Sequence, residues 1–262
     1  MEHPIRTLTV EKLKVLVYAN RAELWRAAGA AVAAKMRDLL SNRKRISMVF
    51  AAADSQKELL EDLVRQPGLD WSRVTAFHMD EYLGVPGTAP QSFGRWLRTR
   101  LFDHVHPGII HVMDGLAEPD LECRRYSELL DSAPPDLCCL GIGENGHLAF
   151  NDPPVADFED TAAVKRVEID EASQIQQAAE GNFAKASDVP RDALTLTIPA
   201  LLSASFLYGC VPGPRKAKAV RAALLDPIST ACPATVLRRH PGTTLYLDSD
   251  SASLIDTTLA RR

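Results

Sequence analysis

Several features that mark particular classes of protein are missing from this sequence. Its 262 residues include five cysteines, none in a C-x-x-C spacing, and Cys138 and Cys139 are neighbours in an apolar run. This usage is typical of reduced, buried thiols and argues against a disulfide framework or a zinc site. No run approaches the ~20 apolar residues that span a bilayer, and no apolar signal core is found near the start. We therefore expect a cytoplasmic protein without a membrane partner.

An excess of charge of one sign is also missing. Lys and Arg number 30 and Asp and Glu 34, so the net charge is −4. A nucleic-acid partner is therefore not expected. The hydrophobic fraction of 46% is ordinary for a globular protein with a full core. Because the chain has no internal repeat and no low-complexity linker, we expect one domain over residues 1–262.

Short apolar runs typical of strands alternate with helical patterns along the chain. The expected strands are 14–18, 45–50, 74–79, 109–112, 137–140, 164–169, 205–211 and 243–247. The expected helices begin near Asn20, Ser55, Ser92, Pro119 and Pro214. This alternation predicts an α/β fold: a mainly parallel, open, doubly wound (Rossmann-like) sheet with helices on both faces. Residues 155–190, rich in charge, Ala and Gln, are expected to form a lid or an excursion at the sheet edge.

The loop after strand 137–140 is the richest in chemical groups. Its glycines are Gly141, Gly143 and Gly146, and its polar side chains include Asn145, His147 and Asp152. Ligands of open α/β sheets lie beyond the carboxyl ends of the strands. An imidazole beside polar and acidic groups is suited to moving protons near neutral pH. We therefore interpret this loop as the floor of an active site.

Two other interpretations of the loop stay open. The three glycines spell G-x-G-x-x-G, which is the dinucleotide-binding fingerprint when its third glycine opens a helix. Pro153 and Pro154 disfavour that helix, because an interior proline costs roughly 3 kcal/mol. The remaining alternative is a structural glycine turn with His147 hydrogen-bonded in the core.

A second candidate is the pair Asp80 and Glu81 at the end of strand 74–79. Two adjacent carboxylates before a loop with Gly84 and Pro86 are poorly explained by packing. Loops held by a rigid scaffold carry function more often than cores do. The alternative is a solvated turn.

With these loops placed, the sequence resembles the glucosamine-6-phosphate deaminase/isomerase family, whose superfamily includes the 6-phosphogluconolactonases. Phe77–Pro86 is similar to the family's N-M-D-E-Y-x-G-L-P, and Gln91–Val105 to its helix before F-F-D-H-V. Gly141–Pro153 is similar to G-x-G-x-D-G-H-I-A-F-N-E-P. The lactonase branch has neither M-D-E-Y nor A-F-N after the histidine, so the deaminase branch is favoured.

The resemblance implies an enzyme that converts glucosamine 6-phosphate to fructose 6-phosphate and ammonia, classed as a hydrolase of an amino sugar phosphate, without metal or cofactor. Asp80 would move the proton from C2 to C1. His147 would open the sugar ring, oriented by Asn145 and Asp152. An isomerase or deaminase for another sugar, a lactonase-like hydrolase and a non-catalytic sugar sensor stay open, and so does a homo-oligomeric state.

The chain also departs from the family pattern. Asn145 replaces an Asp, and Asp152 replaces a Glu. The phosphate-binding P-T-G-G-T-P is replaced by Ala51–Gln56, and no counterpart of the phosphate Arg occurs in 176–182, whereas Lys216 matches the phosphate lysine. We expect Asp54 either to cap the next helix together with Ser55, which is favoured, or to bind sugar hydroxyls. The expected substrate-binding residues are Ala53, Asp54, Ser55, Glu81, Gly141, Gly143 and Lys216.

Overall fold

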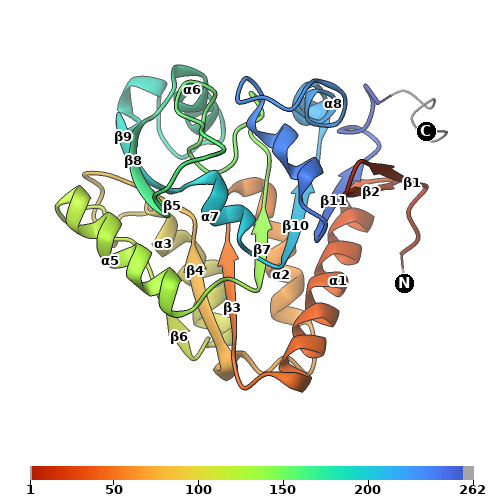
Figure 1. Cartoon of the computed structure of the whole chain (residues 1–262), viewed down its shortest axis with the longest axis horizontal. Helices are drawn as coiled ribbons and strands as arrows, with labels where there is room; N and C mark the ends of the chain where they lie inside the picture. The colour runs from red at the N-terminus through yellow and green to blue at the C-terminus, as the bar shows by residue number, and fades with distance from the viewer. Residues whose placement is uncertain (1, 256–262) are drawn as a thin grey trace.

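An eight-stranded sheet forms the centre of the protein, in the order β1-β2-β11-β10-β7-β3-β4-β6 (Figure 1). The structure is a computed structural model that describes residues 2–255, so residue 1 and residues 256–262 of the predicted domain lie outside the described residues. The strands are β1 (Arg6–Val10), β2 (Leu13–Tyr18), β3 (Ile46–Phe50), β4 (Val74–His78), β6 (Ile109–Ile110), β7 (Leu137–Leu140), β10 (Phe206–Val211) and β11 (Thr243–Asp248). Every neighbouring pair is parallel except β1–β2. The prediction of a mainly parallel open sheet is confirmed.

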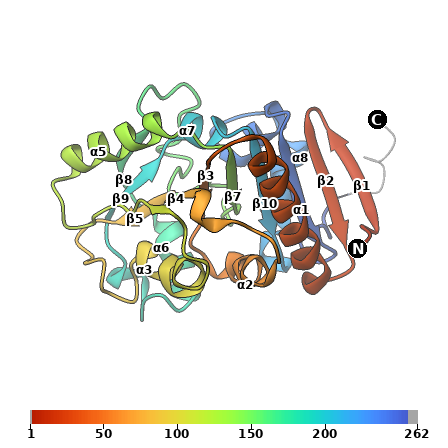
Figure 2. The same cartoon turned by 90° about the horizontal axis from the view of Figure 1, so that it is seen from below.

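Helices cover both faces of this sheet (Figure 2). One face carries α1 (Arg21–Asn42), α2 (Lys57–Arg65) and α3 (Phe93–Leu97), which a π-helical turn (Arg98–Phe102) joins to α4 (Asp103–Val105); the other carries α5 (Pro119–Ser132), α7 (Ile198–Leu202) and α8 (Ala217–Leu225). Successive strand residues point to opposite faces. Accordingly Val49 lies in one hydrophobic cluster, whereas Met48 and Phe50 lie in the other. The doubly wound arrangement is therefore confirmed.

The predicted helix starts near Asn20, Ser92 and Pro119 are confirmed, and a 3₁₀ turn at Pro214 leads into α8. A helix also begins near Ser55, but the predicted cap there is wrong. Asn20 caps α1 by accepting a hydrogen bond from Glu23 N–H at 3.0 Å, and Ser92 caps α3 through Arg95 N–H at 3.2 Å. Ser55 caps no helix, because Asp54–Gln56 form a 3₁₀ turn, after which α2 begins with no side-chain cap. The 3₁₀ turn holds its N–H groups by short-range backbone bonds, so the hydroxyl is not needed there.

A small antiparallel sheet lies beyond the carboxyl ends of the central strands (Figure 1). It consists of β5 (Asp80–Tyr82), β9 (Asp192–Leu196) and β8 (Val164–Glu168), in the order β5-β9-β8. Of its strands, β8 belongs to the segment 155–190 expected as a lid or edge excursion, and so does α6 (Glu171–Ala179). That the segment opens and closes as a lid stays a prediction.

Three strands have no counterpart among the expected ones: β1, β5 and β9, the last of which comes shortly after the segment expected as an excursion. β1 is an edge strand that pairs antiparallel with β2, and its side chains are mostly exposed or half-buried, so it lacks a clear apolar run. β5 has only three residues and is formed by the Asp-Glu-Tyr stretch itself, which pairs with β9. A polar segment of this length carries no periodic signal.

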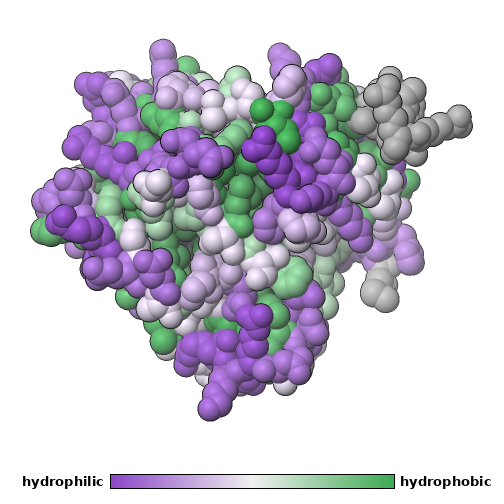
Figure 3. Space-filling model, viewed as in Figure 1, coloured by the Kyte–Doolittle hydropathy of each residue, from purple (hydrophilic) through white to green (hydrophobic). Residues whose placement is uncertain are grey.

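The surface of the molecule carries both polar and apolar side chains. Figure 3 shows hydrophilic and hydrophobic side chains interspersed over one face of the molecule. Within residues 2–255, no helix combines the length and the apolar character needed to cross a bilayer.

Candidate active site

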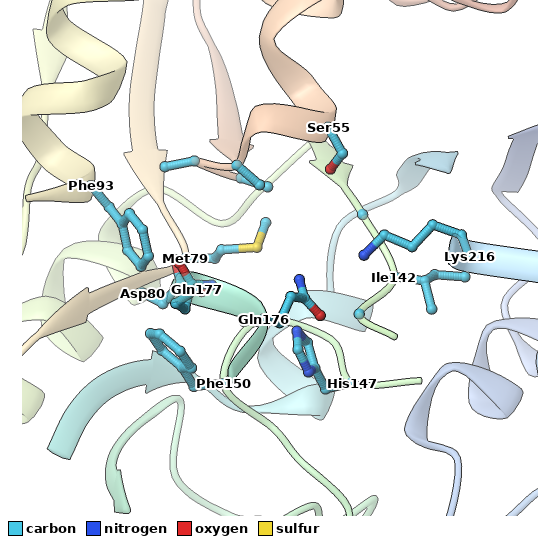
Figure 4. A pocket seen from close by; sticks show the side chains of 16 residues that line it. Ser55, Met79, Asp80, Phe93, Ile142, His147, Phe150, Gln176, Gln177 and Lys216 are labelled. Carbon is cyan, nitrogen blue, oxygen red and sulfur yellow. The ribbon is translucent and has the colours of Figure 1, made fainter. Parts of the chain in front are cut away.

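Loops from four adjacent strands of the sheet surround one cavity at their carboxyl ends. These loops follow β10, β7, β3 and β4, which are neighbours in that order. The α6 helix lies above the carboxyl ends of these strands (Figure 1), and its Gln176 and Gln177 line the cavity. The cavity is lined by Ala51, Ala52, Ala53, Ser55, Met79, Asp80, Phe93, Gly141, Ile142, Gly143, His147, Ala149, Phe150, Gln176, Gln177 and Lys216 (Figure 4). This is where ligands bind in open α/β sheets.

The loop after β7 turns back on itself and does not continue as a helix. Residues 141–163 form turns and one isolated bridge, so the dinucleotide interpretation of the three glycines is wrong. Gly146 has a φ of +87°, which favours glycine. A Cβ at Gly143 would lie 2.2 Å from Nε2 of His147, so only glycine lets the imidazole sit this close. The glycines therefore shape the site around His147.

Among the described residues, Asp80 is the one carboxylate that lines the cavity. It follows the buried strand β4 and is 9% exposed. Burial raises the pKa of its carboxyl group well above the usual range, and the neighbouring charge of Glu81 adds to this. Within residues 2–255, no hydrogen bond to the carboxylate offsets the burial. A carboxylate of this kind is a stronger base than a solvated one.

His147 and Asp152 form a hydrogen-bonded pair behind the cavity wall. Nδ1 of His147 lies 2.9 Å from Oδ1 of Asp152, and the Asp152 side chain is fully buried. Burial works to raise the pKa of Asp152, but hydrogen bonds from His147, Asn145 and Ser173 outweigh it, so the pKa is lowered. Asp152 is therefore ionised near neutral pH and holds the imidazole in place.

Asn145 reaches the imidazole only through other groups. Its Nδ2 donates to Oδ1 of Asp152 at 2.8 Å, and its Oδ1 accepts from the His147 backbone N–H at 3.0 Å. We expected the side chains of Asn145 and Asp152 both to contact the imidazole ring. For Asn145 this is wrong, because its side chain contacts Asp152 and the backbone of His147. An amide has both a donor and an acceptor, so it can bridge the two.

Lys216 approaches from the side opposite Asp80, with His147 and Gln176 between them in Figure 4. The turn before it is held by Asp248, whose two carboxylate oxygens accept from Gly213 N–H at 3.0 and 2.9 Å. Lys216 is 8% exposed and forms no ion pair or hydrogen bond with the described side chains. Burial lowers its pKa, against the raising effect of Glu180 and Glu144. A buried, unpaired ammonium beside a cavity is a site for an anion.

Seven of the eleven predicted residues line the cavity, Asn145 and Asp152 lie behind its wall, and Glu81 and Asp54 lie elsewhere. Ala53, Ser55, Gly141 and Gly143 line it, as do Asp80, His147 and Lys216. Glu81 does not line the cavity. Its carboxylate accepts four hydrogen bonds, from Ser92 Oγ at 2.7 Å and from the N–H groups of Tyr82, Phe93 and Gly94, each at 3.0 Å. It anchors the start of α3, so its expected place in substrate binding is corrected.

Asp54 also lies outside the cavity. It is exposed and lines a neighbouring surface groove of about 540 Å³, together with residues such as Lys57 and Arg215. The groove shares Ser55 and Lys216 with the cavity. Asp54 neither caps α2 nor enters the cavity, so both expectations for its side chain are wrong.

Several residues of the cavity were missed. Gln176 and Gln177 come from α6, and Phe93 and Phe150 from two separate segments. Gln176 Oε1 accepts from Glu144 N–H at 3.0 Å, which ties α6 to the loop after β7. Two adjacent glutamines in a polar helix carry no distinctive sequence signal, since only the tertiary contact gives them a role. No group of three or more His, Cys, Asp or Glu within residues 2–255 is arranged to hold a metal ion.

Comparisons with known proteins agree with this geometry. The sequence profile of the family described as glucosamine-6-phosphate isomerases/6-phosphogluconolactonase matches residues 19–246. Glucosamine-6-phosphate deaminases of Bacillus cytotoxicus and Bacillus thuringiensis are each 37% identical to this chain over 198 residues, which is 75% of this chain and 74% of each relative.

Solved structures show the same fold. A monomeric glucosamine-6-phosphate deaminase superposes with a TM-score of 0.84 at 29% identity, over 92% of this chain and 99% of that one. A 6-phosphogluconolactonase from Thermotoga maritima superposes with a TM-score of 0.72 at 22% identity, over 90% of this chain and 99% of that one, which bears on the fold alone. With its profile match over residues 19–246, this chain belongs to the family of glucosamine-6-phosphate isomerases and 6-phosphogluconolactonases.

Proposed function

We propose that this enzyme converts glucosamine 6-phosphate and water to fructose 6-phosphate and ammonia. The observation that carries the proposal is the combination of a buried, weakly acidic Asp80 and the His147–Asp152 pair on one cavity, with the unpaired Lys216 opposite. Relatives named glucosamine-6-phosphate deaminase at 37% identity support it.

The ring opens first in this mechanism. The cyclic hemiacetal must lose the proton of its C1 hydroxyl and gain one on the ring oxygen, which gives the open-chain aldehyde. The cavity wall around His147 is closed on the Nδ1 side by Asp152, so Nε2 is the nitrogen available to carry this proton. An imidazole suits the step because the same nitrogen can accept a proton from one oxygen and donate it to another.

Isomerisation and loss of ammonia follow. Asp80 takes the proton from C2 of the aldehyde, which leaves an enolamine, and returns a proton to C1, which gives the imine of the ketose at C2. Water adds to this imine, and the carbon–nitrogen bond breaks to release ammonia and the ketone. Since water is consumed and the C–N bond is cleaved, the net reaction is formally a hydrolysis. The raised pKa of Asp80 brings it nearer to that of the weakly acidic C–H bond.

The phosphate is assigned to the side of the cavity that holds Lys216 and Ser55. A buried ammonium supplies one positive charge, and the Ser55 hydroxyl can donate one hydrogen bond. The turn of alanines at residues 51–53 has no glycine that would let the backbone curl around the anion. We therefore expect binding of the phosphate to be weaker than a glycine-rich turn would allow.

This sparse anion side favours one alternative: the same chemistry on a different sugar, with an acidic group other than a phosphate or with none. The alternative of a lactonase-like hydrolase has only the fold and the family description in its favour. The oligomeric state of the chain stays a prediction.

A substrate panel with coupled detection of ammonia and of the ketose phosphate tests the proposal. Glucosamine 6-phosphate, unphosphorylated glucosamine and 6-phosphogluconolactone are compared at matched concentrations. We expect stoichiometric ammonia and fructose 6-phosphate from the first compound alone. Equal kcat/KM for the two amino sugars would show that the phosphate is not recognised and that the substrate is a non-phosphorylated sugar. Hydrolysis of the lactone without release of ammonia would show that the protein is a lactonase and would refute the proposal.

A further inference from the structure

Ser173 is a buried hydroxyl that touches both members of the His147–Asp152 pair. It lies in the first turn of α6 and is 1% exposed. Its Oγ lies 2.5 Å from Oδ1 of Asp152 and 3.0 Å from Nδ1 of His147. It does not line the cavity, so it faces the pair from behind. No sequence motif includes Ser173.

The positions of the hydrogens follow from the chemistry of the three groups. Asp152 is ionised and can only accept, so the short contact requires the Ser173 O–H to donate to it. The hydroxyl has one hydrogen, so towards Nδ1 it can only accept. Asp152 Oδ1 also faces Nδ1 at 2.9 Å and likewise only accepts. Nδ1 therefore carries a hydrogen, and in the neutral ring Nε2 is an acceptor.

The α6 helix is joined to the loop after β7 at two points. One is Ser173, and the other is Gln176, whose Oε1 accepts from Glu144 N–H at 3.0 Å. The same helix places the amides of Gln176 and Gln177 in the cavity wall (Figure 4). A movement of α6 thus changes the cavity wall and the surroundings of the imidazole together.

We propose that Ser173 is a positioning residue, which makes the orientation and the basicity of His147 depend on α6 being docked on the loop after β7. It acts through Asp152: by donating to Oδ1 it holds the carboxylate in the rotamer that receives Nδ1–H. When α6 is displaced, Asp152 loses this donor and Nδ1 loses one of its two acceptors. The assignment rests on the proposed function, since that function gives His147 its task.

The kinetic test is Ser173→Ala, with Ser173→Thr as the variant that keeps the hydroxyl and Gln174→Ala as the matched control. Gln174 lies on the same helix, is half-buried and does not line the cavity. For Ser173→Ala we expect kcat to fall about tenfold, as loss of a charge-assisted hydrogen bond implies. We expect KM to change little, and the acid limb of the pH–rate profile to move to higher pH because Asp152 loses a donor. Ser173→Thr restores both, and Gln174→Ala changes neither.

A loss of kcat with no movement of the acid limb, or a change confined to KM, would overturn the proposal. The melting temperature of each variant is measured, because a packing defect alone would lower it without moving the limb. A limb that moves equally in Gln174→Ala would also overturn the proposal, since any disturbance of α6 would then suffice.

A measurement on the free enzyme separates this proposal from the proposed function. In protein labelled with ¹⁵N-histidine, the His147 signals are assigned by their loss in His147→Gln. We expect the neutral ring of the wild type to carry its hydrogen on Nδ1, and Ser173→Ala to shift the titration of that ring. A neutral ring with its hydrogen on Nε2, or a titration unchanged in Ser173→Ala, would refute the positioning role. Neither result depends on which sugar is turned over.

Discussion

The two sides of the cavity are built differently. On the His147 side, Oδ1 of Asp152 accepts hydrogen bonds from three side chains: the imidazole of His147, the amide of Asn145 and the hydroxyl of Ser173. On the Lys216 side, a single ammonium without a side-chain partner among residues 2–255 lies beside a turn of alanines.

The contrast indicates that side chains must be positioned more precisely on the His147 side than on the Lys216 side. A group that transfers protons must be held within hydrogen-bonding reach of the reacting atom, so its orientation is over-determined. A group that only attracts an anion acts over a longer range and tolerates a looser setting. We therefore expect substitutions on the His147–Asp80 side to change kcat, and those on the Lys216 side to change KM.

The largest expected effect is that of Asp80→Asn. We expect turnover of glucosamine 6-phosphate to fall by at least ~10²-fold, the usual worth of general base catalysis, while substrate binding is largely retained. Near-normal turnover would remove Asp80 from the mechanism. Because the pKa of Asp80 is raised, the wild-type activity should rise with pH through a value above the usual aspartate range.

The same variant has an expected effect on stability, and the sign follows from the direction of the pKa shift. A raised pKa in the folded state means that the charged form is disfavoured there, so the cost appears as pH rises through the folded pKa. Asp80→Asn should match the wild type in melting temperature below about pH 4, the unfolded value, and exceed it at neutral pH. A melting temperature lower than that of the wild type at neutral pH would contradict the burial argument.

Next in size is Glu81→Ala, which tests whether the neighbouring carboxylate is structural. Removing it leaves four donors without their acceptor, three at the start of α3 and the Tyr82 N–H in β5, so we expect the free energy of unfolding to fall by about 2–3 kcal/mol. Glu118→Ala is the matched control, because Glu118 caps α5 in an exposed setting and should cost about 1 kcal/mol. Chemical denaturation measures both, and equal losses would show that Glu81 has no special structural role.

Lys216→Ala comes third and belongs to the other side of the cavity. We expect KM for glucosamine 6-phosphate to rise about tenfold, with a much smaller change in kcat, because uniform binding is lost. Lys57→Ala, which removes an exposed ammonium of the neighbouring groove, is the control and should change KM little. If Lys216→Ala left KM unchanged, the anion side would have to be sought elsewhere.

Asn145→Asp should have a smaller effect. The new carboxylate would face Oδ1 of Asp152, where the amide now donates at 2.8 Å. Like charges raise each other's pKa, so we expect the acid limb of the pH–rate profile to move to higher pH. We expect kcat near its optimum to change less than about tenfold, since one hydrogen bond is worth about 0.5–1.5 kcal/mol. A profile identical to that of the wild type would show that Asp152 does not influence the limb, which would then be set by Asp80 alone.

The smallest effect is expected for Asp54→Asn. Because the side chain is exposed and lies in the groove, KM and kcat should each change by less than about twofold. A strong fall in KM would mean that Asp54 repels the substrate and that the groove is part of the binding site.

The fold and the main site residues could be predicted because their signals are local. A buried parallel strand is a short apolar run, as at Leu137–Leu140, and a capping pattern such as Asn20 with Glu23 involves residues three apart. The loop with Gly143 and His147 also carries its chemistry within a few residues. For these features, spacing along the chain is enough.

What the sequence by itself determined, then, is the α/β class, the strand-end position of the site, and the presence there of Asp80, His147 and Lys216. Only the tertiary structure decided that Glu81 anchors α3, that Asp54 faces a separate groove, and that Ser173 reaches the His147–Asp152 pair. The physical reason is distance along the chain. Ser173 lies 26 residues from His147, and a hydrogen bond between such residues depends on how the helix docks, which no local pattern of residues encodes.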